Sequence, residues 1–118
     1  MALDIKGGGL GANTQGVVPI NDQTGTTYTL VGSDAGKYVR MSNALASTLT
    51  VPPNSSVPFP VGTQITIEQG GVGQVAMVED VGVTINSPAT LLLRDQYSVS
   101  AIVKVGVDEW TIMGDMEI

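Results

Sequence analysis

The chain has 118 residues, no cysteine and no histidine, and it carries a net charge of −6 at neutral pH with only five basic residues. This length corresponds to one domain with its own core. The missing cysteine excludes a disulfide framework and thiolate chemistry, and the missing histidine removes the usual general base and the commonest transition-metal ligand. The scarcity of Lys and Arg argues against nucleic acid or an anionic membrane as a partner.

The N-terminal 25 residues are rich in glycine and polar side chains, with apolar residues spaced among them. A pure linker lacks such apolar residues, so this composition favours a segment that becomes ordered when it meets a surface. The alternative is a frayed terminus without a role. We therefore divide the chain into a flexible arm, 1–25, and a β domain, 26–118. The arm residues expected to contact a partner are Leu3, Ile5, Leu10, Val17 and Val18.

No part of the sequence resembles a segment that targets or crosses a membrane. The start, MALDIKGGGLG, lacks the apolar region of a signal peptide, and the apolar runs are too short for a transmembrane helix. We expect a protein that is made and kept in the cytoplasm, or carried on a particle assembled there.

Short runs of alternating apolar and polar residues begin at Thr26 and continue almost to the C-terminus. Turn signals separate them, at intervals of about eight to twelve residues. Only 89–97 shows a weak helical period. The pattern predicts an all-β fold, a small antiparallel β-sandwich or barrel with an extended N-terminal arm. The expected strands are 26–31, 37–43, 48–52, 64–69, 74–79, 82–86, 91–97, 98–105 and 110–114.

A proline-rich stretch, PPNSSVPFPVGT (52–63), joins two of these strands. Proline cannot donate to a strand ladder, and it forces the preceding residue into an extended conformation. The stretch is therefore expected to be a stiff crossover between two sheets, with Phe59 in the core. Its exposed tip, 54–57, is a candidate contact with a neighbouring subunit through Asn54, Ser55 and Ser56, but a purely structural element is the preferred interpretation.

No motif predicts catalysis. GSDAG (32–36) is not a nucleophile elbow and has no histidine to activate its serine, and GGGLG (7–11) lacks the lysine of a P-loop. Asp115 and Glu117 could bind a hard cation such as Ca²⁺, but a solvated acidic end is the preferred interpretation. Trp110 is expected to anchor the core. We therefore expect no enzyme activity, no catalytic residue, no metal site and no cofactor.

Three segments together resemble a module that recurs in virion proteins of tailed bacteriophages. They are residues 33–75, GVTINSP (82–88) and QYSVSAIVKVGVDEWTIMGD (96–115), and the proline loop is the most specific part. The positions that carry the resemblance are Asp34, Gly36, Lys37, Val39, Arg40, Pro52, Pro53, Asn54, Ser55, Phe59, Pro60, Gly62, Thr63, Gln64, Ile65, Lys104, Asp108, Trp110, Gly114 and Asp115.

The resemblance implies structural or binding work in a virion, without catalytic residues to carry over. In that family the module is commonly part of a longer protein, whereas here it makes up most of the chain. This favours a capsid decoration, or cement, protein: a homotrimer on the outer capsid surface, bound to the major capsid protein and assembled in the host cytoplasm. The alternative is a tail or tail-fibre component that binds a host surface.

Overall fold

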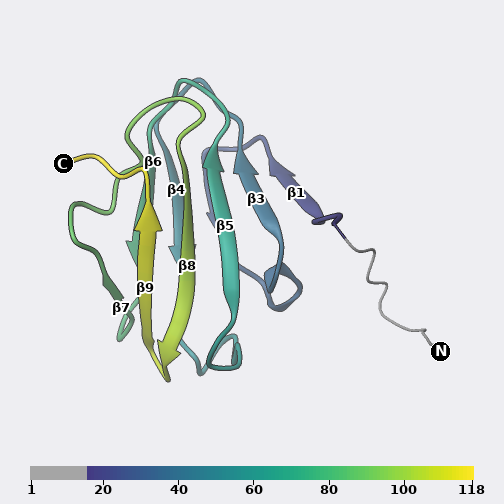
Figure 1. The fold of residues 1–118 in the computed structure, drawn as a ribbon, viewed down its shortest axis with the longest axis vertical. Helices are drawn as coiled ribbons and strands as arrows, with labels where there is room; N and C mark the ends of the chain where they lie inside the picture. The colour runs from purple at the N-terminus through teal and green to yellow at the C-terminus, as the bar shows by residue number, and fades with distance from the viewer. Residues whose placement is uncertain (1–15) are drawn as a thin grey trace.

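A computed structural model describes residues 16–118, which form two layers of β-sheet (Figure 1). The described residues contain one short 3-10 helix (Gly32–Asp34) and no α-helix. The all-β class predicted from the sequence is therefore confirmed. The strands are β1 (Ile20–Gln23), β2 (Thr27–Thr29), β3 (Tyr38–Met41), β4 (Ser47–Val51), β5 (Gln64–Gln69), β6 (Val75–Glu79), β7 (Thr84–Asn86), β8 (Val99–Gly106) and β9 (Glu109–Gly114).

From β1 to β6 the chain alternates between the two sheets. β1, β3 and β5 pair in parallel in one sheet, and β2, β4 and β6 pair in parallel in the other. Each successive pair of strands is thus one coil of a small solenoid, and the three coils stack on one another. β8 and β9 extend the first sheet with antiparallel pairing, and β7 pairs in parallel with β9, which gives the order β1-β3-β5-β8-β9-β7.

This pairing differs from the antiparallel sandwich or barrel that the sequence predicted, because five of the seven strand pairs are parallel. The segment 91–97 also forms no strand of its own; Leu92 and Leu93 make only isolated bridges. In addition, β1 lies within the segment that the sequence assigned to the arm. The folded sheet therefore starts at Ile20, before the predicted domain boundary at residue 26.

The core lies between the two sheets and follows the period-two alternation of the strands. In β4, for example, Leu49 and Val51 point inward and are fully buried, whereas the alternate residues Thr48 and Thr50 face outward. The buried hydrophobic residues are Leu30, Val39, Met41, Leu49, Val51, Phe59, Ile65, Ile67, Val75, Met77, Val83, Ile85, Leu93, Ile102, Trp110, Ile112 and Met116.

Along one side of the solenoid, the turns that join the two strands of each coil stack in close contact. The Asn43 amide donates to the carbonyl of Thr24 in the first coil, and Gly73 N–H of the third coil donates to the Asn43 carbonyl. A Cβ on Gly73 would lie 1.9 Å from the Leu45 carbonyl oxygen, so only glycine fits there. The proline loop lies on the opposite side of the solenoid and carries the chain from β4 to β5.

Candidate functional site

The two ends of the stack of coils differ, because the chain covers the last coil and, within residues 16–118, leaves the first coil uncovered. After the third coil, β8, β9 and β7 extend the first sheet beyond β5. The free side of β6 is covered by residues 91–93: Met77 N–H donates to the Leu91 carbonyl, and Leu93 N–H donates to the Val75 carbonyl. The last coil is therefore capped by the chain's own C-terminal part, as stacked repeat folds require.

The first coil has no such cover among residues 16–118, and its strands β1 and β2 end their sheets. Pro19 and Gln23 carbonyls accept hydrogen bonds from β3 and the residue after it, so Ile20 and Asp22 direct their main-chain groups away from β3. The carbonyl of Thr26 likewise accepts a hydrogen bond from β4, so Thr27 and Thr29 direct theirs outward. One coil thus presents two unpaired strand edges, which we call the open edge.

Apolar side chains accompany the open edge. Val17 and Val18, which lead into β1, are 66% and 47% exposed, and Ile20 within β1 is 57% exposed. An exposed edge strand with apolar side chains is a template for pairing with another chain. Val17 and Val18 were among the interface residues predicted from the sequence. The other predicted arm contacts, Leu3, Ile5 and Leu10, lie outside the described residues.

A buried carboxylate holds the two strands of the open edge together. Asp34 is fully buried, and it accepts hydrogen bonds from the Tyr28 hydroxyl of β2 (2.6 Å), the Asn21 amide of β1 (2.9 Å) and Val31 N–H (2.9 Å). Burial, and then the hydrogen bond to Asp34, raises the pKa of Tyr28 to about 12. Apart from the turn expected at Asp34, no sequence pattern predicted this cluster. Its effect is to hold the two strands of the open edge in a fixed position relative to each other.

Charged side chains cross the outer face of the large sheet next to the open edge. Asp22, Arg40 and Glu68 are register partners on β1, β3 and β5. Arg40 Nε donates to Glu68 at 3.1 Å, and Ser42 Oγ donates to Asp22 at 2.9 Å. Tyr38 also donates to Glu68, and burial followed by this hydrogen bond raises the pKa of Tyr38 to about 12. The only charge of β1 is therefore held in this network.

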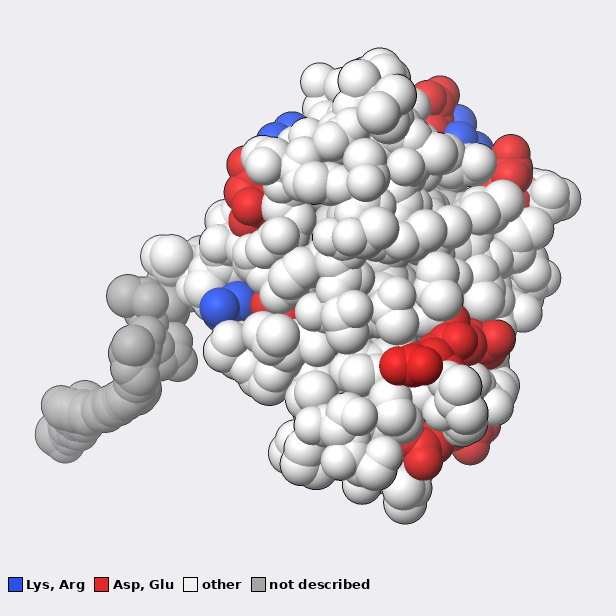
Figure 2. All heavy atoms as spheres, turned by 180° about the vertical axis from the view of Figure 1, so that it is seen from behind, with Lys and Arg blue, Asp and Glu red and all other residues white. Residues whose placement is uncertain are grey.

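The outer face of the small sheet is uncharged. Its register rows are Thr27–Thr48–Ala76 and Thr29–Thr50–Val78. Figure 2, a view from behind, shows this side of the molecule: the centre is free of charged residues, and acidic groups gather low on the face. The open edge of β2 borders this uncharged face, so a strand added there would meet hydroxyl and methyl groups.

The proline-loop residues predicted to touch a neighbour divide into two kinds. Ser55 and Ser56 are exposed at the tip. Asn54 instead contacts two residues of its own chain: its main-chain N–H donates to Asp108 (2.7 Å), and its side-chain oxygen accepts from Lys104 (2.7 Å). Asn54 is therefore part of the internal anchoring of the loop.

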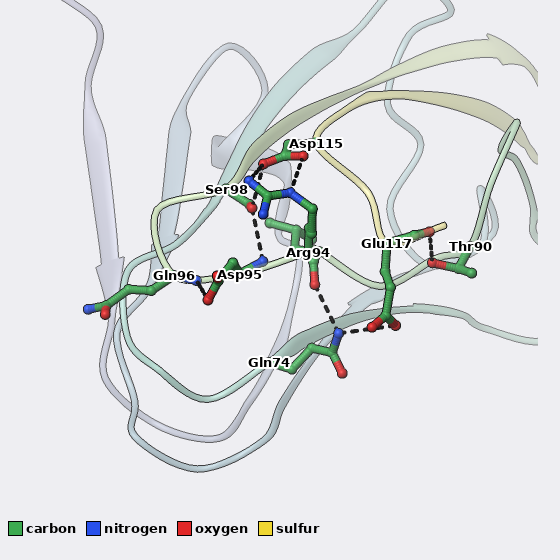
Figure 3. A network of polar contacts seen from close by, with 9 residues as sticks. Gln74, Thr90, Arg94, Asp95, Gln96, Ser98, Asp115 and Glu117 are labelled. Atoms are coloured by element: carbon green, nitrogen blue, oxygen red, sulfur yellow. Dashed lines mark hydrogen bonds and ion pairs between the residues drawn. The ribbon is translucent and has the colours of Figure 1, made fainter.

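The acidic C-terminal residues belong to a hydrogen-bond network that ties the segment 90–98 to the C-terminal strand end (Figure 3). Arg94 binds both oxygens of Asp115 at 2.8 Å, and Ser98 donates to the same carboxylate. The hydrogen bonds from Arg94, and next that from Ser98, lower the pKa of Asp115. Glu117 accepts a weak hydrogen bond from Gln74 at 3.4 Å. The structure therefore pairs Asp115 with a guanidinium, and residues 16–118 hold no cluster of three potential metal ligands.

Neither a scan against protein-family models nor a search of curated proteins found a match to this chain. Across residues 16–118 there is no helix with the length and apolar character needed to cross a membrane. Within residues 16–118, the candidate site is an uncapped pair of strand edges, which exposed apolar side chains flank.

Proposed function

We propose that this protein is a non-catalytic structural component of a virion, a decoration protein that binds the outer capsid surface through its open edge. The observation that carries the proposal is the first coil, which residues 16–118 leave uncovered, so that within this range β1 and β2 both present unpaired main-chain groups. Strand addition to such an edge obtains affinity from main-chain hydrogen bonds and specificity from alternate side chains. The resemblance of residues 33–115 to phage virion modules supports the same assignment.

The proposed partner of the open edge is an extended segment of the major capsid protein. Asp34 already holds Asn21 and Tyr28 in place, so a partner strand pays the ordering cost largely alone. Ile20 and Val18 would supply apolar contacts beside the new ladder. Many copies on one particle would add their effects, which compensates for a small contact area per copy.

The location is tested by labelling virus particles from the source culture with antibodies against the purified protein. Label over the heads is the expected result. Label over tails or fibres would favour a host-surface binding module, and particles without label would contradict a virion role altogether.

The contact is tested by Ile20→Lys, which places a charge at the open edge, with Met113→Lys as matched control. The two side chains are 57% and 51% exposed and lie on the same register row, but Met113 lies on β9, an interior strand of the sheet that has β8 on one side and β7 on the other. Ile20→Lys should keep the melting temperature and lose sedimentation with particles, whereas Met113→Lys should retain both. Equal sedimentation of both variants would contradict docking through the open edge.

We also propose that the protein acts as a homotrimer. Small decoration modules gain avidity when several copies bind a repeating surface together. Light scattering at micromolar concentration should give three times the chain mass, and a mass of one chain, together with monomeric density on the particle, would contradict the trimer.

A further inference from the structure

A buried lysine faces an asparagine amide beneath the proline loop. Lys104, on β8, is only 2% exposed. Its Nζ donates to Asn54 Oδ1 at 2.7 Å and to the Phe59 carbonyl at 2.8 Å. These contacts hold the amine nitrogen against the side-chain amide of Asn54, and holding two groups in place in this way promotes a reaction between them.

Lys104 has no carboxylate within ion-pair distance among residues 16–118, where the charged pairs are Arg40–Glu68 and Arg94–Asp115. An ammonium buried with neutral acceptors alone is costly. The nearby acid, Asp108, instead accepts the main-chain N–H of Asn54 at 2.7 Å. Asp108 therefore positions Asn54, and the structure leaves the amine and the amide facing each other.

Rigid packing keeps the two groups in contact. The Phe59 and Trp110 rings pack edge to face with their centres 5.5 Å apart, and Lys104 Nζ lies 6.0 Å from the centre of the Trp110 ring. Lys104 also exchanges main-chain hydrogen bonds with the loop, donating to Thr63 and accepting from Gly62. The proline loop cannot drift away from β8 without breaking all of these contacts.

We propose that Lys104 and Asn54 join in an intramolecular isopeptide bond. The ammonium first gives a proton to water, and the neutral amine then attacks Cγ of Asn54. The Cγ–Nδ2 bond breaks, one amine proton passes to the leaving nitrogen, and ammonia departs. The product is an amide between Nζ and Cγ; no oxidant, reductant or other reactant is consumed. The reaction also removes the buried positive charge.

The bond would lock the proline loop to β8 and close a loop between residues that are 50 positions apart in the chain. Such a crosslink restricts the unfolded chain as a disulfide does, in a protein that has no cysteine. It would act on the fold itself and would leave the open edge unchanged, so it stands or falls independently of the proposed capsid binding.

Mass spectrometry of the purified full-length protein tests the proposal directly. The crosslinked chain should be lighter than its sequence by one ammonia. Trypsin should then fail to cut after Lys104, and peptide 41–94 should remain joined to peptide 95–118. Separate peptides 41–94, 95–104 and 105–118 of unmodified mass, after prolonged warming of the folded protein, would overturn the proposal.

Asn54 precedes Ser55, so loss of ammonia could also come from a succinimide at Asn54. Lys104→Arg separates the two reactions, because it keeps the positive charge and the asparagine but provides no amine. The joined peptide and the mass loss should both vanish in Lys104→Arg. A mass loss that persists in this variant, confined to peptide 41–94, would assign it to the succinimide and overturn the crosslink. Asn54→Ala should likewise give separate peptides, with circular dichroism to confirm that each variant is folded.

Discussion

Replacing Trp110 by alanine should come close to unfolding the protein. Trp110 is 1% exposed, lies on β9 between Ile85 of β7 and Lys104 of β8, and packs edge to face against Phe59. Truncation of a buried Trp to Ala costs about 3–5 kcal/mol, and the lost aromatic pair accounts for about 0.5–1.5 kcal/mol of such an effect. A domain of this size has a total stability of about 5–15 kcal/mol, so the loss would range from about a fifth of the total stability to all of it.

Urea unfolding followed by far-ultraviolet circular dichroism measures this loss, because the variant has no tryptophan left for fluorescence. The expected result is a midpoint far below that of the parent, or no folded baseline at all. Met113→Ala is the matched control: it lies on the same strand but is 51% exposed, and its effect should stay within about 0.5 kcal/mol. A Trp110→Ala variant with the parent's unfolding curve would refute the assignment of this ring to the core.

Three further predictions concern polar and glycine positions. Tyr28→Phe should lower the free energy of unfolding by about 1–3 kcal/mol, because the buried Asp34 carboxylate loses its shortest hydrogen bond. The folded-state pKa of Tyr28 is raised to about 12 from 10.0, so its ionisation removes stability only as pH rises from about 10 through 12. An absorbance titration of the variant should therefore lack one late-titrating group. Arg94→Gln should lower the melting temperature slightly at neutral pH, and the difference should fade as pH falls from 3.8 through the depressed folded-state pKa of Asp115; a constant difference down to that pH would contradict the pairing. Gly73→Ala should destabilise the protein by more than about 1–3 kcal/mol, because the added Cβ would overlap a backbone carbonyl. Gly25→Ala is the control: its Cβ would have no neighbour closer than 4.0 Å, so its thermal melting should be close to that of the parent.

Side-chain alternation made the strands and their faces predictable. In β3 and β4 the inward residues Val39 and Leu49 are fully buried, as the pattern required. The same alternation occurs in parallel and antiparallel strands, so it could not distinguish a solenoid from a sandwich of hairpins. The parallel register depends on contacts between residues far apart, such as Tyr38 with Thr66, and no local pattern encodes them.

β1 was missed because its sequence, INDQ, has a single apolar residue, and that residue, Ile20, faces solvent. The strand forms because its main chain pairs in parallel with β3 and because the Asn21 side chain donates a hydrogen bond to Asp34. The open edge consequently had no sequence signal beyond the apolar residues Val17 and Val18. A tertiary contact, and not the propensity of the segment, decides its conformation.

Lys104 illustrates the opposite case, in which part of the signal was present. Alternation along β8 places Lys104 on the same face as Ile102, and that face is buried. A lysine at a core position needs a partner, which the sequence could have raised as a question. Its answer, Asn54, is 50 residues away on the proline loop and became visible only in three dimensions.

The capped end of the solenoid limits how copies of this chain can associate. Stacking the open edge of one copy on the last coil of another would build an open-ended fibre. Residues 91–93 cover β6, and the far strand of the large sheet, β7, is only three residues long, so the last coil offers little for β1 and β2 to pair with. Two open edges could meet only about a two-fold axis, which gives a dimer. The proposed trimer would therefore have to use another surface, such as the uncharged outer face of the small sheet, and its three open edges, as residues 16–118 define them, would stay available for the proposed capsid contact.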